Sequence, residues 1–537
     1  METIKDIVLA KVPAALIEEK QFLTITVNPE DLRGLAKAVR AEGYDFLIHL
    51  TGVDYGDSLG VVYLVGKSVD MNTALVLKTA TGDREKPFLP TVSDIWGSAE
   101  LNEREVYGFF GIVFIDHPDM RHIFLTERWK GFPFRKDYDN TPNELDVKSY
   151  DMPEYSSRWV QGTNGPEERR YLTFEEDDYV LNIGPQHPAT HGVLHFRTAL
   201  DGEIIKKIDV NCGYIHRGIE KLSEDLTYPQ ILHFTDRLDY LSSHINRHGL
   251  CMCVEKAAGI EVPERAQYIR TIMDELTRIA SHLLSWACMC MDMGALTAFI
   301  YGMRDREKIL DIFEGTCGGR LITNYNVIGG VMADIAPSFQ DDVKAFIKLM
   351  RKNLKEYHTL YTGNIIARQR MIGVGPLSNE MAVSYSVTGP VGRGSGFHCD
   401  LRKIAPYAAY DKVEFKEIIR TEGDSMARYL NRLDEIVESL SIIEQLIDRI
   451  PEGEFCAKTK AIIKLPEGEY YQRVEAARGE FGVYILSKGD KTPYRLKFRS
   501  PSMTLVSIMD KVCHGGKISD LVTIGGSMDY VIPDIDR

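Results

Sequence analysis

Two histidines stand close together in a loop that prolines and glycines constrain. The segment from Gly184 to Gly192 reads GPQHPATHG and carries His187 and His191 on either side of Pro188. Prolines stiffen a backbone and glycines let it turn tightly, so the loop would present both imidazoles from a fixed position. Imidazole titrates near neutral pH, which suits a hydrogen-bond donor or a proton carrier for a ligand. A metal pair is disfavoured because Pro188 opposes the helix that would align the rings, and bonds to nearby backbone are the alternative.

A single carboxylate interrupts a long apolar stretch. Between Ile279 and Met303 the only charged side chain is Asp292. The stretch is long enough to cross a bilayer, but its polar residues and its continuity with an amphipathic pattern favour a buried helix of a bundle. A buried carboxylate must be paired, protonated or facing a cavity. Burial would raise the pKa of Asp292 and make it a proton donor; a structural pair with an arginine or histidine is the alternative.

Two further segments carry polar groups of interest. Tyr240 ends the run from Asp236, DRLDY, and offers either a phenolic donor or a core tyrosine. Arg217 lies in the run from Gly213 to Lys221, GYIHRGIEK, which crowds charges into a short turn. Taken alone, such a run is more typical of a salt-bridged surface than of a site.

Motifs for nucleotides and metals are missing from the sequence. It contains no GxxxxGK[ST] loop and no GxGxxG after a strand. Its nine cysteines include no CxxC pair, and the CxC pairs at 251/253 and 288/290 would point to different faces of a helix. We therefore expect this chain itself to bind no metal and no iron–sulfur cluster.

The order of elements predicts two folded parts and a linker. Residues 1–139 form an α/β unit, with helices over 29–42 and around Trp96 and Glu105 and with strands at 46–50, 61–65 and 74–77. Residues 140–178 form an acidic linker that runs over a surface, since the interval 137–178 holds twelve acids, four bases and no apolar period. Tyr155, Trp159 and Tyr171 could anchor this linker to a neighbour.

The remainder, 179–537, is predicted to be a mixed domain. A β-meander covers 179–211, with a hairpin turn at Asp201-Gly202. Long helices follow, from Pro263, from Ser338 and over 426–440, with the periodicity of a helix bundle. The tail from about residue 455 becomes strand-rich again.

Composition sets limits on the class of protein. The 537 residues carry a net charge of −14, which argues against nucleic-acid binding because polyanions need a basic footprint. Nine cysteines are too few and odd in number for a disulfide scaffold, which indicates reduced thiols in a cytosolic compartment. The first twenty residues lack the pattern of a secretory signal.

Taken together, long segments resemble two subunits of the proton-pumping NADH–quinone oxidoreductase, respiratory complex I. The segments GPQHPATHGVL, GYIHRGIEKL, FTDRLDYLS, RGEFGVYILSKGDKTPYRLKFRSPS and IPDIDR resemble its D subunit. Glu103-Arg104-Glu105 with GIVFIDHPDMRHI and FPFRKDY resembles its C subunit. The resemblance covers nearly the whole chain and implies a fused C/D subunit, whose D-like part is similar to the large subunit of nickel–iron hydrogenases without the metal site.

The resemblance implies a quinone-reduction cavity shared with a neighbouring subunit. His191 and Tyr240 would hold the quinone headgroup, and Asp292 would be the acidic partner of His191. His187 would flank the same loop, and Arg217 would lie near an iron–sulfur cluster held by a B-like partner protein. The chain would couple quinone reduction to proton translocation.

Further partners and a location follow from the same resemblance. They are the membrane-arm subunits (H-like and A-like) and NADH-oxidising subunits, on the cytoplasmic face of the bacterial inner membrane. The sequence leaves open whether NADH or a ferredoxin-like carrier is the electron donor. A structural docking role in a ferredoxin- or hydrogenase-type complex is the alternative. A nickel–iron enzyme would need CxxC pairs where this chain has Asp236 to Asp239 and Asp534 to Arg537.

One position departs from the family pattern. The family commonly carries a histidine in an arginine–methionine–histidine run that is suspected of titrating with the terminal cluster. Here the corresponding run is Arg320-Leu321-Ile322. Isoleucine cannot titrate, so we expect weakened or relocated coupling between the redox state of the cluster and protonation.

Overall fold

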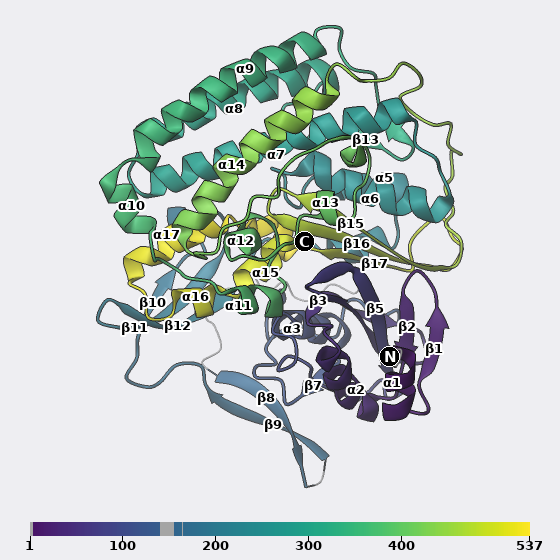
Figure 1. Ribbon diagram of the computed structural model, residues 1–537. Helices are drawn as coiled ribbons and strands as arrows, with labels where there is room; N and C mark the ends of the chain where they lie inside the picture. The colour runs from purple at the N-terminus through teal and green to yellow at the C-terminus, as the bar shows by residue number, and fades with distance from the viewer. Residues whose placement is uncertain (1–3, 140–154, 164) are drawn as a thin grey trace.

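The chain folds into two parts that share a hydrophobic cluster, and a β-hairpin that follows the first part along the chain extends at the bottom of the view (Figure 1). The computed structural model describes residues 4–139, 155–163 and 165–537. Buried apolar side chains from both parts, such as Phe109 and Ile535, belong to one continuous cluster. Among the described residues, no helix is both long and apolar enough to cross a membrane.

A five-stranded sheet lies at the centre of the first part. Its strands are arranged in the order β1-β2-β5-β4-β3. They are β1 (Leu16–Glu19), β2 (Leu23–Thr26), β3 (Phe46–Asp54), β4 (Leu59–Lys67) and β5 (Asp70–Thr81), and the helices are α1 (Ile4–Lys11), α2 (Pro29–Ala41) and α3 (Ala99–Phe110). The three predicted strands lie within β3, β4 and β5, which are longer than predicted. Buried polar residues such as Thr51 and Thr79 continue them beyond the apolar runs.

Part of the predicted linker forms a hairpin. β8 (Tyr155–Gly162) pairs antiparallel with β9 (Gly165–Leu172), beside the parallel pair β6 (Phe88–Pro90) and β7 (Val113–Ile115). Trp159 packs against Phe88 with ring centroids 5.4 Å apart, and the Tyr171 hydroxyl donates to the carbonyl of Pro118. Two of the three predicted aromatic anchors thus contact the first part, whereas Tyr155 is exposed. The strands were not predicted because the segment lacks an apolar period. The stretch 140–154 of the predicted linker lies outside the described residues.

The predicted meander opens the second part. β10 (Tyr179–Ile183), β11 (His195–Asp201) and β12 (Ile204–Asn211) form an antiparallel sheet in that order. The turn between β11 and β12 uses Gly202 in the left-handed region, with φ +61°. A short 3₁₀ turn, η1 (Pro188–Thr190), occupies the loop between β10 and β11.

Five long helices form a bundle, seen at the top and centre of Figure 1. They are α6 (Ser243–Ala258), α7 (Glu264–Asp292), α8 (Leu296–Cys317), α9 (Phe339–Tyr357) and α14 (Ser425–Leu446). The prediction of one helix through the apolar stretch 279–303 is wrong: α7 ends at Asp292, and Gly294, with φ +87°, turns the chain into α8. Glycine adopts this backbone conformation at little cost. Asp292 therefore stands at a helix end.

The C-terminal region adds a second sheet and short helices. β15 (Gly468–Ala476), β16 (Gly479–Ser487) and β17 (Arg495–Arg499) are antiparallel, and α17 (Ile518–Met528) packs against α7 and η1. The remaining elements are α4 (Ile219–Ser223), α5 (Tyr228–Thr235), β13 (Asn326–Val327), β14 (Gly330–Val331), η2 (His358–Thr362), α10 (Ile365–Met371), α11 (Asn379–Ser384), α12 (Gly389–Gly394), α13 (Leu401–Ile404), η3 (Tyr410–Lys412), α15 (Pro501–Ser507), α16 (Met509–Cys513) and α18 (Ile532–Asp536).

A buried cluster of charges joins the two parts. Glu105 of α3 accepts hydrogen bonds from Lys497 and from Arg537, the latter at 2.6 Å. Arg537 also lies 3.1 Å from Glu220, which pairs with Arg495 at 2.9 Å. Burial opposes the ionisation of Glu105, but the charges of Arg537 and Lys497 outweigh it and lower its pKa. These ion pairs fix the first part against the sheet of the second.

Replacing Glu105 by glutamine is expected to lower the free energy of unfolding by about 3–5 kcal/mol, because two buried cations lose one of the two carboxylates that they share. Urea unfolding of the full-length chain measures this. Glu19→Gln is the control, because the ion pair of Glu19 with Lys5 is exposed, and it should leave the urea midpoint of unfolding unchanged. Because the pKa of Glu105 is lowered, its contribution should be lost as pH falls through that pKa. Equal midpoints for the two variants would contradict this account.

Candidate active site

His191 stands at the end of a tightly folded loop. The hydroxyl of Thr190, the last residue of η1, lies 2.8 Å from the carbonyl oxygens of both His187 and Gly192. His191 itself adopts φ +54°, a left-handed conformation that is uncommon for a residue with a side chain. Gly192 lies against α18, where a β-carbon would come within 2.6 Å of Ile532. The backbone therefore fixes the direction of the His191 imidazole.

The imidazole of His191 contacts the carboxylate of Asp292. Nε2 of His191 lies 2.5 Å from Oδ2 of Asp292, and the two side chains are 25% and 10% exposed. Gly526 of α17 lies beside this carboxylate, since a β-carbon there would be in ordinary contact, 3.4 Å, with the same oxygen. A loop, the end of α7 and a glycine of α17 thus combine to form one hydrogen-bonded acid–base pair.

The pair favours a protonated imidazole. Burial favours the neutral ring, but the hydrogen bond and negative charge of Asp292, with a smaller contribution from Asp529, hold the pKa of His191 above its ordinary value. His191 Nδ1 has no hydrogen-bond partner among the residues that the structure describes. A protonated His191 would therefore keep one N–H free for a ligand.

Tyr240 lies beside a second buried pair. The residue before it, Asp239, accepts hydrogen bonds of 3.1 and 2.9 Å from Nη1 of Arg478. Tyr240 is half-buried, and burial raises its pKa, against a lowering by the charge of Arg478. Its hydroxyl bonds to no other part of the described chain. The charges of Arg478 and Asp529 act on both Tyr240 and His191, so the two free donors share one electrostatic environment.

The two flanking residues are exposed. His187 shares the loop of His191, and its imidazole is exposed. Arg217 is exposed as well, and its Nη2 donates to the carbonyl of Arg237 at 3.1 Å, three residues before Tyr240. His187 thus shares the loop of His191, and Arg217 contacts the segment that leads to Tyr240.

Sequence reasoning missed two charged residues near these donors. Arg478 occupies the turn between β15 and β16 within the motif RGEFG, and Asp529 follows α17 with φ +62°. Each is more than nine-tenths buried. In the sequence, the only indication of Arg478 was an arginine next to a glycine, in RGEFG. For Asp529 the sequence offers only an aspartate after a run of small residues.

The arrangement suits proton donation to a polar ligand. An imidazole N–H and a phenol O–H, both without partners in the described ranges, can each donate to one oxygen of a substrate. Those ranges contain one group of candidate cation ligands, Glu175, Asp177 and Asp178, and Lys206 already pairs with two of them. That acidic group belongs to the connection after β9, outside the His191 loop.

Comparisons with known proteins agree on one family. Residues 25–144 match the family described as respiratory-chain NADH dehydrogenase, 30 Kd subunit. Residues 292–465 and 457–537 match respiratory-chain NADH dehydrogenase, 49 Kd subunit. The two matches fall on the first and the second folded part.

Individual relatives extend the agreement over nearly the whole chain. The NADH-quinone oxidoreductase C/D subunit of Phocaeicola vulgatus is 60% identical over 509 residues, which cover 94% of this chain and 97% of the relative. The C/D subunit of Bacteroides fragilis is 58% identical over 508 residues, or 92% and 95%. The D subunit of Desulfotalea psychrophila is 48% identical over 363 residues, or 67% and 98%. The chain thus belongs to the family of fused C/D subunits of NADH-quinone oxidoreductase, a multi-subunit enzyme complex, with its C-like domain first and its D-like domain second.

Proposed function

We propose that this chain walls the cavity in which quinone is reduced, and that His191 and Tyr240 hold the quinone headgroup. The observation that carries the proposal is the pair of unpartnered donors, His191 Nδ1 and Tyr240 Oη, under the common charges of Arg478 and Asp529. Each donor would hydrogen-bond one carbonyl oxygen. Donors placed in advance stabilise the negative charge that develops on the oxygens as electrons arrive.

The chemistry requires two electrons and two protons per quinone. The electrons would come from an iron–sulfur cluster on a B-like partner protein, with Arg217 on the side of that cluster. One proton would pass from His191 and one from Tyr240 to the two carbonyl oxygens, giving the quinol. His187 would flank the headgroup from the same loop.

Asp292 would lose its ion pair when His191 gives up a proton. A neutral His191 no longer pairs with Asp292 as an ion, so the carboxylate gains an unbalanced charge at the end of α7. This change would be passed to membrane-arm subunits, H-like and A-like, and so to proton translocation. The chain would lie peripherally on the cytoplasmic face of the membrane and receive electrons that enter through NADH-oxidising subunits.

The D-like domain would share the fold of the nickel–iron hydrogenase large subunit while using different groups at the metal positions. That enzyme class needs pairs of thiolates at positions where this chain has Asp236 and Asp239. Asp236 accepts a hydrogen bond of 2.8 Å from Arg247, and Asp239 accepts one from Arg478. Near the C-terminus, Asp534 accepts from the Ser500 hydroxyl at 2.6 Å. Buried carboxylates already bonded to side chains of this chain suit a polar cavity wall better than a nickel site.

Photo-crosslinking with a light-activated quinone tests the proposal in the assembled complex. We expect label on peptides that contain the loop 184–192 or the segment 236–241, and loss of that label when excess unlabelled quinone competes. Label confined to other subunits would overturn the proposal and favour a structural docking role for this chain.

The isoleucine at position 322 gives a separate expectation for the complex. Ile322 is half-buried and has no group that titrates. The midpoint potential of the partner's terminal cluster should therefore be independent of pH across the neutral range, as a redox titration followed by EPR would show. An ordinary slope with pH would count against this expectation.

A further inference from the structure

We propose that Arg478 is a positioning residue for quinone reduction, which fixes the segment of Tyr240 and the carboxylate of Asp529 relative to the His191–Asp292 pair. The inference rests on the proposed function and adds to it a residue that would not touch the quinone. It identifies one side chain that holds together the separate elements of the site.

A single guanidinium bonds to three elements besides its own. Its Nη1 donates to Asp239 at 2.9 and 3.1 Å and to the Ser281 hydroxyl of α7 at 3.0 Å. Its Nε donates to the backbone carbonyl of Asp529 at 2.6 Å, and Nη2 donates to the carboxylate of Asp529 at 3.0 Å. Arg478 is 1% exposed. The planar fork of five N–H donors suits this arrangement, which one ammonium group could not reproduce.

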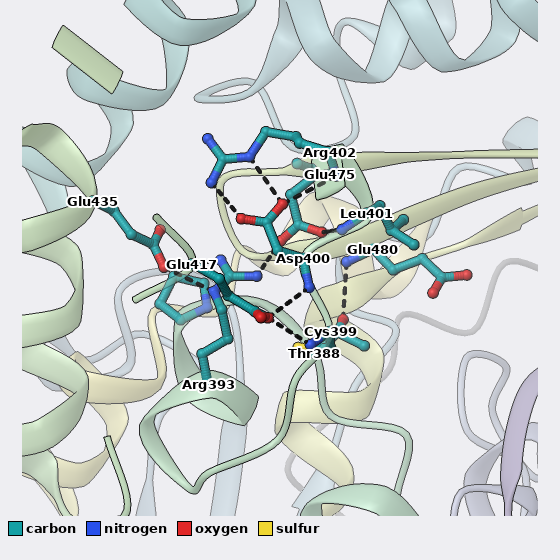
Figure 2. A network of polar contacts seen from close by, with 12 residues as sticks. Thr388, Arg393, Cys399, Asp400, Leu401, Arg402, Glu417, Glu435, Glu475 and Glu480 are labelled. Atoms are coloured by element: carbon teal, nitrogen blue, oxygen red, sulfur yellow. Dashed lines mark hydrogen bonds and ion pairs between the residues drawn. The ribbon is translucent and has the colours of Figure 1, made fainter. Parts of the chain in front are cut away.

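The turn that carries Arg478 is itself held rigidly. Ala477 and Arg478 form the two-residue turn between β15 and β16. On one side of the turn, Glu475 accepts from Arg393 at 2.7 Å; on the other, the backbone N–H of Glu480 donates to the Thr388 hydroxyl at 2.9 Å (Figure 2). A residue whose base is fixed on both sides can position what it binds.

Two of the partners of Arg478, Asp239 and Asp529, lie next to different proton donors. Asp239 directly precedes Tyr240, so the ion pair sets the position of the phenol. Asp529 follows the last turn of α17, and that turn contains Gly526, which faces Asp292. Loss of the Arg478 side chain would therefore loosen both the Tyr240 segment and α17, which lies against Asp292.

The charge of Arg478 also acts on both donors. The groups that influence His191 are Asp292, Asp529 and Arg478. The pKa of Tyr240 is affected by the charges of Arg478, Asp239, Asp529 and Cys288. Tyr240 in turn affects the pKa of Arg306 on α8. Arg478 is the cation common to the two donors, and it lowers the pKa of each. Arg432 also lies 3.7 Å from the carboxylate of Asp529. Without Arg478 the nearby aspartates would be opposed less, and both donors would hold their protons more tightly.

Arg478→Gln tests the proposal in the assembled complex, with NADH-dependent quinone reduction followed as a function of pH. We expect kcat/KM to fall about 100-fold through misplacement of the donors, and the alkaline limb of the profile to move to higher pH. Arg478→Lys keeps the positive charge but loses the planar set of N–H donors. Its kcat/KM should therefore fall, while the alkaline limb of its pH profile stays in place. The matched control is Arg473→Gln. Arg473 lies on β15 and its guanidinium donates to the Met71 carbonyl, so the substitution should leave the alkaline limb of the pH profile unchanged.

Asp239→Asn supplies a second route if Arg478→Gln fails to assemble. It keeps the shape of the partner and removes its charge, and kcat/KM should fall about tenfold as the hold on the Tyr240 segment weakens. Two results would overturn the positioning role of Arg478 and leave the proposed quinone site intact. One is an alkaline limb of the pH profile that does not move in Arg478→Gln, and the other is wild-type kinetics in Asp239→Asn. Wild-type quinone reduction by Tyr240→Phe would instead overturn the proposed function on which the role rests.

Discussion

Replacement of Tyr240 by phenylalanine is expected to lower quinone reduction by the assembled complex about 10²–10³-fold, the usual effect of removing one donor to a developing oxyanion. The substitution keeps the ring and its half-buried packing and removes only the hydroxyl. That hydroxyl bonds to nothing else within the described chain, so its loss leaves no group of the described chain without a partner. The expected effect is therefore on turnover and not on folding.

The assay compares two acceptors in the same membranes. NADH oxidation with a quinone should fall, whereas NADH oxidation with an artificial acceptor that reacts at the NADH-oxidising subunits should persist. Tyr228→Phe is the matched control, because it also removes a tyrosine hydroxyl, that of a buried residue of α5 beside Ser487. His191→Ala should behave like Tyr240→Phe. Quinone rates within twofold of the wild type for both would contradict the account.

Replacement of Asp292 by asparagine is expected to move the alkaline limb of quinone reduction to lower pH. Asp292 is the group that raises the pKa of His191 against the effect of burial. The pair therefore keeps His191 protonated up to a pH above its ordinary pKa, and activity falls as pH rises through the raised value. With asparagine, the effect of burial dominates, the pKa of His191 falls, and the proton is lost at a lower pH.

Profiles of kcat and of kcat/KM against pH measure this shift, and its sign is opposite to the one expected for Arg478→Gln. Asp311→Asn is a suitable control, since Asp311 is an exposed residue of α8 that pairs with Arg320. A limb that stays in place in Asp292→Asn would mean that a group other than His191 sets the pH dependence.

The sequence predicted those features that depend on local chemistry. Helix α7 begins after Pro263 and α14 carries the predicted apolar seam, because capping and periodicity are properties of a short segment. The loop with His191 and the isolated Asp292 could be singled out because each departs from the expected composition of its surroundings. Their contact could not be foreseen from spacing, since 101 positions separate the two residues.

What remained hidden depends on distant contacts. The β8–β9 hairpin has no apolar period because β8 contacts the first part through a few aromatic side chains and backbone hydrogen bonds, while β9 is largely exposed. The break after Asp292 required a single glycine in the left-handed region within an otherwise apolar run. Arg478 matters through partners on three other elements, and no local pattern indicates which carboxylates a buried arginine will meet.

The most direct test of the central claim is a structure of the assembled complex with quinone bound. The account predicts one carbonyl oxygen within hydrogen-bonding distance, about 2.6–3.2 Å, of His191 Nδ1 and the other equally close to Tyr240 Oη. Asp292 should remain on Nε2 of the same imidazole. A headgroup bound for reduction elsewhere, with both donors still facing solvent, would contradict the assignment of this chain as the wall of the quinone cavity.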